Sequence, residues 1–145
     1  MNDDSPSSAK SVRQTSVGRM LNLLSRRLNN EMSERLNELG LTMNGFFVLM
    51  HLLEAEGLTQ SGLGKKIALP PYGMTRLIDS LQEKGLVERR EDPNSRRNHH
   101  IYLTDAGHAI GPKVFALVQG VNEWLLDGLE PAEKQTFADT LAKIL

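Results

Sequence analysis

The sequence predicts a mainly α-helical protein with one small β-hairpin, and three observations lead to this prediction. Apolar residues recur at steps of three and four residues near both ends of the chain, over residues 17–40 and 108–145, which is typical of long amphipathic helices. Between these segments, two short helical patterns are joined by a Pro-containing turn. Two Val-, Ile- and Tyr-rich segments, 86–90 and 99–103, then flank a turn sequence. This order of parts predicts a winged helix-turn-helix over residues 42–107.

Length and composition favour one globular domain. The chain has 145 residues, 39% of them hydrophobic and 24% charged, which allows one well-formed core. Residues 1–15 are polar and predict a disordered N-terminal arm, so we expect residues 16–145 to form a single domain. No apolar run is long enough to span a bilayer and the first residues do not resemble a secretory signal, so we expect a cytoplasmic protein without membrane contact. The absence of cysteine excludes disulfides, thiol nucleophiles and cysteine–zinc sites.

Start and stop signals delimit the first two helices. The long stripe that begins near residue 17 ends at Gly40. Thr42 can cap a second helix, which is apolar on so many sides that it should lie at the centre of the core, and which ends at Gly57.

The helix-turn-helix follows. Thr59 can cap a short helix over residues 60–68, and after the turn a second helix is expected from about residue 71 to 84, with Gly85 as its stop. Its apolar side is formed by Leu77, Ile78 and Leu81. The opposite side is polar and suited to approach base edges in a major groove: Tyr72, Gly73, Thr75, Arg76 and Asp79.

The hairpin is expected to carry a basic tip. Asp92-Pro93-Asn94-Ser95 supplies turn residues, and the loop between the strands would carry Arg96 and Arg97. A flexible basic loop of this kind can enter a narrow minor groove, where negative potential is concentrated.

The charge distribution supports the same region, although the whole chain carries a net charge of −1. Residues 65–100 hold eight Lys or Arg against five Asp or Glu, whereas residues 101–145 hold three against six. The positive charge therefore gathers where the DNA contact is predicted, and the alternative, an ordinary solvated face, stays open at this point.

The two flanking helical regions, 17–40 and 108–145, leave more apolar surface than one copy of a compact domain can cover. A homodimer would bury this surface, and two copies could then occupy half-sites about one helical turn apart on double-stranded DNA. We therefore expect a pseudo-palindromic operator.

From residue 17 to the end of the chain, the sequence resembles the MarR family of bacterial transcriptional regulators. The most specific part runs from Thr75 to Arg89, continues through Asp92-Pro93-Asn94-Ser95-Arg96-Arg97, and ends at Leu103-Thr104-Asp105-Ala106-Gly107. The resemblance implies an obligate dimer with interlocking terminal helices that acts as a repressor or an activator by occupying an operator. It also implies frequent release by a small aromatic or anionic ligand.

The family pattern also implies roles for single residues. Arg76 would lie on the DNA-reading helix, Arg97 would be the minor-groove arginine, and Arg96 would contact a phosphate. The family usually has Asp at the position of Ser95, where the carboxylate braces the arginine of the loop. We hypothesise either a looser loop or one braced by Asp92.

A small-molecule effector pocket is expected between the dimer helices and the DNA-binding part, as the family resemblance implies, with Arg19, Phe47 and His51 as pocket residues. His51 also has a simpler interpretation as a satisfied core histidine. His99 and His100 are adjacent on a strand and therefore face opposite sides, so contact with DNA or solvent is favoured over a metal site.

The other function classes lack their characteristic residues. No phosphate-binding Gly-rich loop, metalloprotease His pair or nucleophile turn is present in the sequence, so we expect neither an enzyme nor a cofactor. The remaining alternative is a winged-helix module that binds another protein, which would carry exposed apolar anchors in place of the polar face around Thr75 and Arg76.

Overall fold

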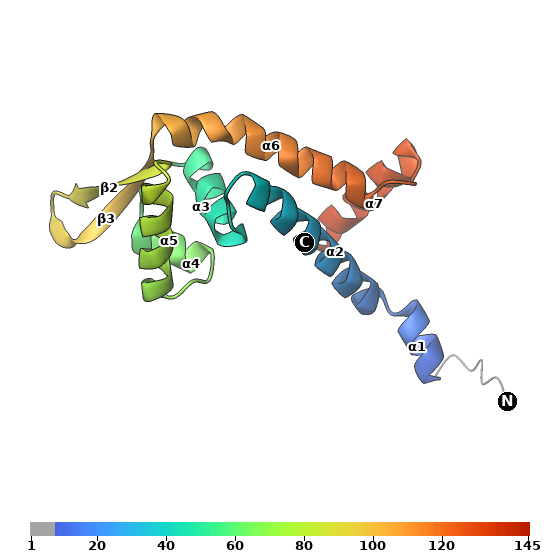
Figure 1. The fold of residues 1–145 in the computed structure, drawn as a ribbon. Helices are drawn as coiled ribbons and strands as arrows, with labels where there is room; N and C mark the ends of the chain where they lie inside the picture. The colour runs from blue at the N-terminus through green and yellow to red at the C-terminus, as the bar shows by residue number, and fades with distance from the viewer. Residues whose placement is uncertain (1–7) are drawn as a thin grey trace. The chain divides into compact units, whose positions relative to one another are not determined.

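The structure, a computed structural model, describes residues 8–145 (Figure 1). Within that range the helices are α1 (Ala9–Thr15), α2 (Val17–Glu38), α3 (Met43–Glu54), α4 (Gln60–Lys66), α5 (Pro71–Glu83), α6 (Asp105–Leu125) and α7 (Pro131–Ile144). The strands are β1 (Leu58–Thr59), β2 (Val87–Asp92) and β3 (Ser95–Leu103). The chain divides into two compact units, one formed by residues 33–120 and one by the residues through Met32 together with Val121–Leu145. We call these the central unit and the terminal unit.

The central unit contains the winged helix-turn-helix that the sequence predicts over residues 42–107. Its core gathers apolar side chains from α3, α4, α5 and the sheet, with Leu49, Leu63, Ile78 and Ile101 fully buried. Helices α4 and α5 pack closely because residue 64 is glycine: a Cβ atom there would lie 2.8 Å from Cγ of Met74.

The predicted helix boundaries are confirmed where local chemistry sets them. The side chains of Thr42 and Thr59 each accept a hydrogen bond from the backbone N–H three residues on, at 3.1 and 3.0 Å, and so cap α3 and α4. The expected stop residues adopt a left-handed backbone, with φ of +71° at Gly40 and +72° at Gly85. Helix α4 is shorter than the expected 60–68, because Ala68 in the turn also has a positive φ of 54°.

The sheet has three antiparallel strands in the order β1-β3-β2, so the predicted hairpin is joined by a third, two-residue strand. We call β2, β3 and the turn between them the wing. Strand β3 begins at Ser95, which corrects the expectation that Arg96 and Arg97 lie in the loop: both belong to the strand. The register is irregular at this point, since Glu91 pairs with His99 but the next residue, Asp92, pairs with Ser95.

The junction between the wing and α6 explains the glycine of the Leu-Thr-Asp-Ala-Gly segment. A Cβ atom at Gly107 would lie only 2.1 Å from the carbonyl oxygen of Leu86, so no larger residue fits without movement of the backbone. The Thr104 hydroxyl accepts a hydrogen bond from the Gly107 N–H at 3.1 Å and donates one to the carbonyl of Gly85 at 2.5 Å. These contacts fix the start of α6 against the end of α5.

The terminal unit has almost no core of its own. Of the buried hydrophobic side chains of residues 8–145, only Met32 (6% exposed) and Val121 (0% exposed) belong to it, and α7 buries none. Large apolar side chains are instead exposed along this unit, including Val17 (66%), Met20 (50%) and Ile144 (74%).

The expected disordered arm differs from the structure over residues 9–15, which form helix α1. The Ser8 side chain accepts a hydrogen bond from the Ser11 N–H at 3.2 Å and caps this helix, although no residue of α1 is buried. The rest of the predicted arm, residues 1–7, lies outside the described residues. No helix within residues 8–145 combines the length and hydropathy needed to cross a bilayer.

Candidate nucleic-acid interface

Helix α5 has one buried side and one exposed side, as a DNA-reading helix requires. Met74, Ile78 and Leu81 are buried, and Leu77, expected among them, is half-buried. Of the predicted contact residues, Tyr72, Thr75, Arg76 and Asp79 are exposed, with Tyr72 at 72%. Gly73 is the exception: it is half-buried, and a Cβ atom there would lie 3.1 Å from Cγ of Leu69. Its lack of a side chain therefore serves packing within the turn.

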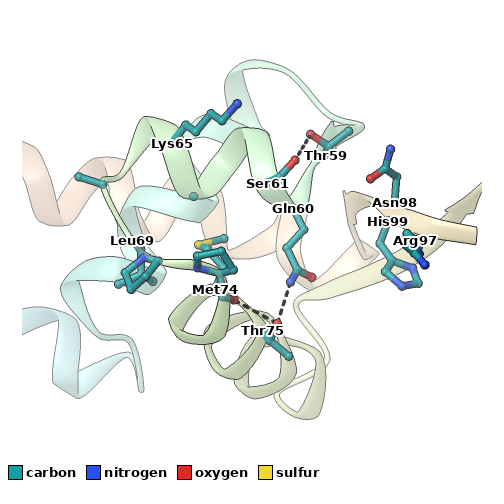
Figure 2. A pocket seen from close by; sticks show the side chains of 14 residues that line it. Thr59, Gln60, Ser61, Lys65, Leu69, Met74, Thr75, Arg97, Asn98 and His99 are labelled. Atoms are coloured by element: carbon teal, nitrogen blue, oxygen red, sulfur yellow. Dashed lines mark hydrogen bonds between the residues drawn. The ribbon is translucent and has the colours of Figure 1, made fainter. Parts of the chain in front are cut away.

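The hydroxyl of Thr75 is held within the helix-turn-helix. It donates to the carbonyl of Pro71 and accepts from the Nε2 amide of Gln60, each at 3.1 Å (Figure 2). The Gln60 contact joins the first turn of α4 to the exposed side of α5. A partner that contacts Thr75 would meet a hydroxyl in a fixed orientation.

Arg89 on β2 connects three elements of the central unit. Its Nε donates to Oε1 of Gln60 at 3.1 Å, and Nη2 donates to the Thr75 carbonyl, also at 3.1 Å. Its Nη1 forms an ion pair with Asp79 at 2.5 Å and donates to Oε1 of Gln82 at 3.1 Å. The Arg89 side chain is only 19% exposed. The guanidinium thus fixes α5 relative to both α4 and the wing, and Asp79 contributes to this connection.

Arg90, the next residue, is also engaged within the chain. Its guanidinium pairs with Glu88 at 2.5 Å and lies over the ring of Tyr102, 3.9 Å from the ring centroid. The hydrogen bond and charge of Glu88 raise the pKa of Arg90 further. Lys84 is likewise engaged, because its Nζ donates to the carbonyl of Gly40.

The other cations of residues 65–100 have no such partners. Five side chains form no hydrogen bond or ion pair with any residue of 8–145: Lys65, Lys66, Arg76, Arg96 and Arg97. We call these the unpaired cations. All five are exposed, and they lie on α4, on α5 and near the tip of the wing. Charge that stays available in this way can neutralise the phosphates of a polyanion.

Asp92 does not pair with Arg97, which removes the hypothesis that Asp92 takes the place of the carboxylate missing at Ser95. Its Oδ1 accepts from the Asn94 N–H at 2.8 Å and its Oδ2 lies 3.3 Å from Nε2 of His100. Both contacts lower the pKa of Asp92. Within the described residues, Arg97 has no acidic partner, and the looser arrangement stays a hypothesis.

His99 and His100 diverge as expected for adjacent strand residues. The Nδ1–H of His100 donates to the carbonyl of Gly57 at 2.8 Å, and this contact, followed by the one with Asp92, raises the pKa of His100. His99 instead lines a hollow of about 620 Å³ together with Lys65 and Arg97 (Figure 2). No group of three or more His, Asp or Glu within residues 8–145 is arranged to hold a metal ion.

The chain is similar in sequence to known proteins. Residues 39–98 match the sequence profile described as the MarR family. The multiple antibiotic resistance protein MarR of Escherichia coli K12 is 31% identical over 130 residues, which cover 89% of this chain and 90% of that protein. The chain belongs to the MarR family.

Solved structures of the MarR family agree with this assignment. The wild-type apo form of E. coli MarR matches with a TM-score of 0.82 and 31% identity, over 89% of this chain and 96% of that chain. The MarR family protein Rv2887 of Mycobacterium tuberculosis, solved in complex with DNA, matches with a TM-score of 0.78 and 25% identity, over 90% and 98% of the two chains. Its sequence, described as an HTH-type transcriptional repressor, is 28% identical over 81% of this chain and 84% of its own length.

The residues predicted for an effector pocket in this MarR-family chain are not all brought together. Phe47 and His51 line one hollow of about 440 Å³ between α3 and α6. Arg19 does not line it and belongs to the terminal unit. His51 is therefore a lining residue, half-buried, rather than a fully enclosed core histidine.

The sequence pattern predicts no contact for Arg89 or Gln60 within the folded chain. The amphipathic pattern of α5 contains one signal for the first of these: Asp79 is an acidic residue on a face expected to meet phosphates, which calls for a nearby cation. Nothing in the local sequence indicates Gln60, because its partners lie 15 and 29 residues further along the chain.

Proposed function

We propose that this protein is a homodimeric regulator that binds a pseudo-palindromic operator, with α5 in the major groove and Arg97 of the wing in the flanking minor groove. The observation that carries the proposal is the set of unpaired cations on α4, α5 and the wing. Three of the eight cations in residues 65–100 are used within the chain, and the five that are not used lie on the elements that a winged helix presents to DNA. The solved DNA complexes of E. coli MarR and Rv2887 support this assignment.

The homodimer follows from the exposed apolar surface of the terminal unit. Among residues 8–145, eleven large hydrophobic side chains are exposed, and eight of them belong to this unit. A second copy of the chain is the occupant that would bury them on both partners at once, because a two-fold interface uses the same surface twice. Repression is the favoured direction of regulation, since relatives such as the M. tuberculosis protein are described as repressors.

The alternative of a protein-binding module has less support. Tyr72 is the only large hydrophobic residue of α5 that is exposed, and the other exposed residues of the predicted contact side are Thr75, Arg76 and Asp79. A protein interface of the usual kind would place several apolar or aromatic anchors at its centre.

Fluorescence anisotropy with the DNA upstream of the protein's own gene tests the proposal at two salt concentrations. Arg97→Ala should weaken binding to all sequences and reduce the slope of log K against log salt by roughly 0.9 for each phosphate that the variant no longer neutralises. Arg76→Ala should in addition relax sequence preference, by roughly 1–3 kcal/mol if the side chain reads a base. Lys113→Ala is the matched control, since this exposed cation lies on α6 rather than on α4, α5 or the wing. Binding that does not respond to salt, or equal effects of all three variants, would refute the DNA interface.

A further inference from the structure

A hollow between α3 and α6 of the central unit has the size of a small-molecule site. Its volume is about 440 Å³, and ligand sites in proteins commonly occupy about 300–1,000 Å³. The two helices approach closely beside it because residue 111 is glycine: a Cβ atom there would lie 3.1 Å from Cδ2 of Leu53. One turn further along α6, Phe115 lines the hollow.

Aromatic side chains dominate the lining. The chain has only four phenylalanines, and three of them line this one hollow: Phe46, Phe47 and Phe115. Phe46 is buried and its ring lies against that of Phe47, with centroids 5.3 Å apart and planes tilted by 53°. Phe47 and Phe115 are 40% and 44% exposed, so the central unit leaves both rings available to a ligand. The face of an aromatic ring attracts cations.

The charged residues of the lining also favour a cation. Glu54 contributes a carboxylate, His51 contributes an imidazole three residues earlier on α3, and neither Lys nor Arg is among the lining residues. The larger hollow beside the wing is the reverse, because it is lined by Lys65 and Arg97 and by no carboxylate. The two hollows therefore favour ligands of opposite charge.

We propose that the hollow between α3 and α6 binds a lipophilic cation, such as a quaternary ammonium, a phosphonium or a protonated amine joined to an apolar body. Glu54 pairs with the positive charge, and the rings of Phe47 and Phe115 cover the apolar groups. This proposal goes beyond the proposed function, because it assigns a ligand class to the hollow, and it does not depend on DNA binding. The family resemblance alone implied an aromatic or anionic ligand, so the charge of the ligand separates the two expectations.

Two probes of nearly the same size and shape test the sign of the charge. Tetraphenylphosphonium and tetraphenylborate are titrated calorimetrically into the full-length protein without DNA at about pH 8, where an ordinary imidazole is neutral. We expect the phosphonium to bind at least about tenfold more tightly than the borate. Glu54→Gln, which keeps the side-chain shape, should weaken phosphonium binding by about three- to fivefold, as expected for one partly exposed ion pair.

Two further variants separate a specific site from general adsorption. Glu83→Gln removes one exposed carboxylate from α5 and should leave the binding of both probes unchanged. Phe115→Leu keeps an apolar side chain but removes one ring face, and it should weaken the phosphonium more than the borate. Circular dichroism of each variant verifies that the fold is retained.

Three results would overturn the proposal: no phosphonium binding, equal or tighter borate binding, or an unchanged affinity in Glu54→Gln. Operator binding is measured on the same preparation by anisotropy. A protein that binds the phosphonium but does not bind the operator would contradict the proposed function and leave the site standing. A protein that binds the operator but not the phosphonium would contradict the site alone.

Discussion

The contacts of Arg89 predict how much the free energy of unfolding falls when its side chain is removed. Arg89→Ala removes three hydrogen bonds to uncharged acceptors on Gln60, Thr75 and Gln82, and one ion pair with Asp79. Each hydrogen bond contributes about 1 kcal/mol net, and the ion pair contributes less than that because the Asp79 side chain is 53% exposed. Since bonds made by one group are not additive, we expect a loss of about 2–3 kcal/mol in the free energy of unfolding.

Chemical denaturation at a fixed protein concentration measures this loss. It corresponds to a decrease of roughly 5–10 °C in the melting temperature of a chain of this size. Arg90→Ala is the matched control, because Arg90 pairs only with Glu88 and the Tyr102 ring at the surface and its removal should change the free energy of unfolding by less than about 1 kcal/mol. Arg89→Lys should recover part of the loss, since one ammonium can reach Asp79 but cannot serve all four acceptors.

A double-mutant cycle with Asp79→Asn isolates the ion pair. The coupling energy should be about 0.5–1 kcal/mol, so most of the Arg89 effect must survive in the Asp79→Asn background. If Arg89→Ala costs less than about 0.5 kcal/mol, or no more than Arg90→Ala, then Arg89 does not hold α5 against the wing and the reasoning is wrong.

Three further predictions address the terminal unit, the wing and the turn. Leu21→Glu should shift the mass measured by sedimentation from dimer toward monomer, whereas Asn22→Glu, about 100° further around the same helix, should not; a monomeric wild type would contradict the proposed dimer. Because the folded state raises the pKa of His100, the protonated ring stabilises the fold; this stabilisation is complete below the unfolded pKa of about 6.5 and is lost as the pH rises through the raised value. Melting temperatures between about pH 5.5 and 8.5 should therefore show a downward step that His100→Gln removes, and an unchanged step would assign it to another group. Ala68→Gly should raise the free energy of unfolding by up to about 1 kcal/mol, because φ is +54° at this position and glycine adopts this conformation without strain. A decrease would show that the methyl group of Ala68 stabilises the fold by more than the backbone strain destabilises it.

The sequence predicts those parts of the fold that depend on near neighbours. Helix caps such as Thr42 and Thr59 act through a backbone N–H three residues away, so their effect is visible in a short window of sequence. Strand β1 escaped prediction because it has two residues and is defined only by pairing with β3, as in Leu58 with Ile101. Helix α1 was not predicted for a different reason: it has no apolar stripe in its sequence, and none of its residues is buried.

The candidate site shows the same division between local and non-local information. The sequence reveals how many cations the region has, but their roles depend on whether a carboxylate or a carbonyl lies within reach in the folded chain. Arg89 and Arg97 are both arginines of the wing, yet Arg89 has four acceptors from α4 and α5 and Arg97 has none within the described residues. An engaged guanidinium has already exchanged water for protein partners, whereas an unpaired one keeps its full charge for a polyanion. A charge count over residues 65–100 thus overstates the positive charge that is available for the proposed DNA contact. Five cations are unpaired, and their substitution should change affinity for DNA more than stability.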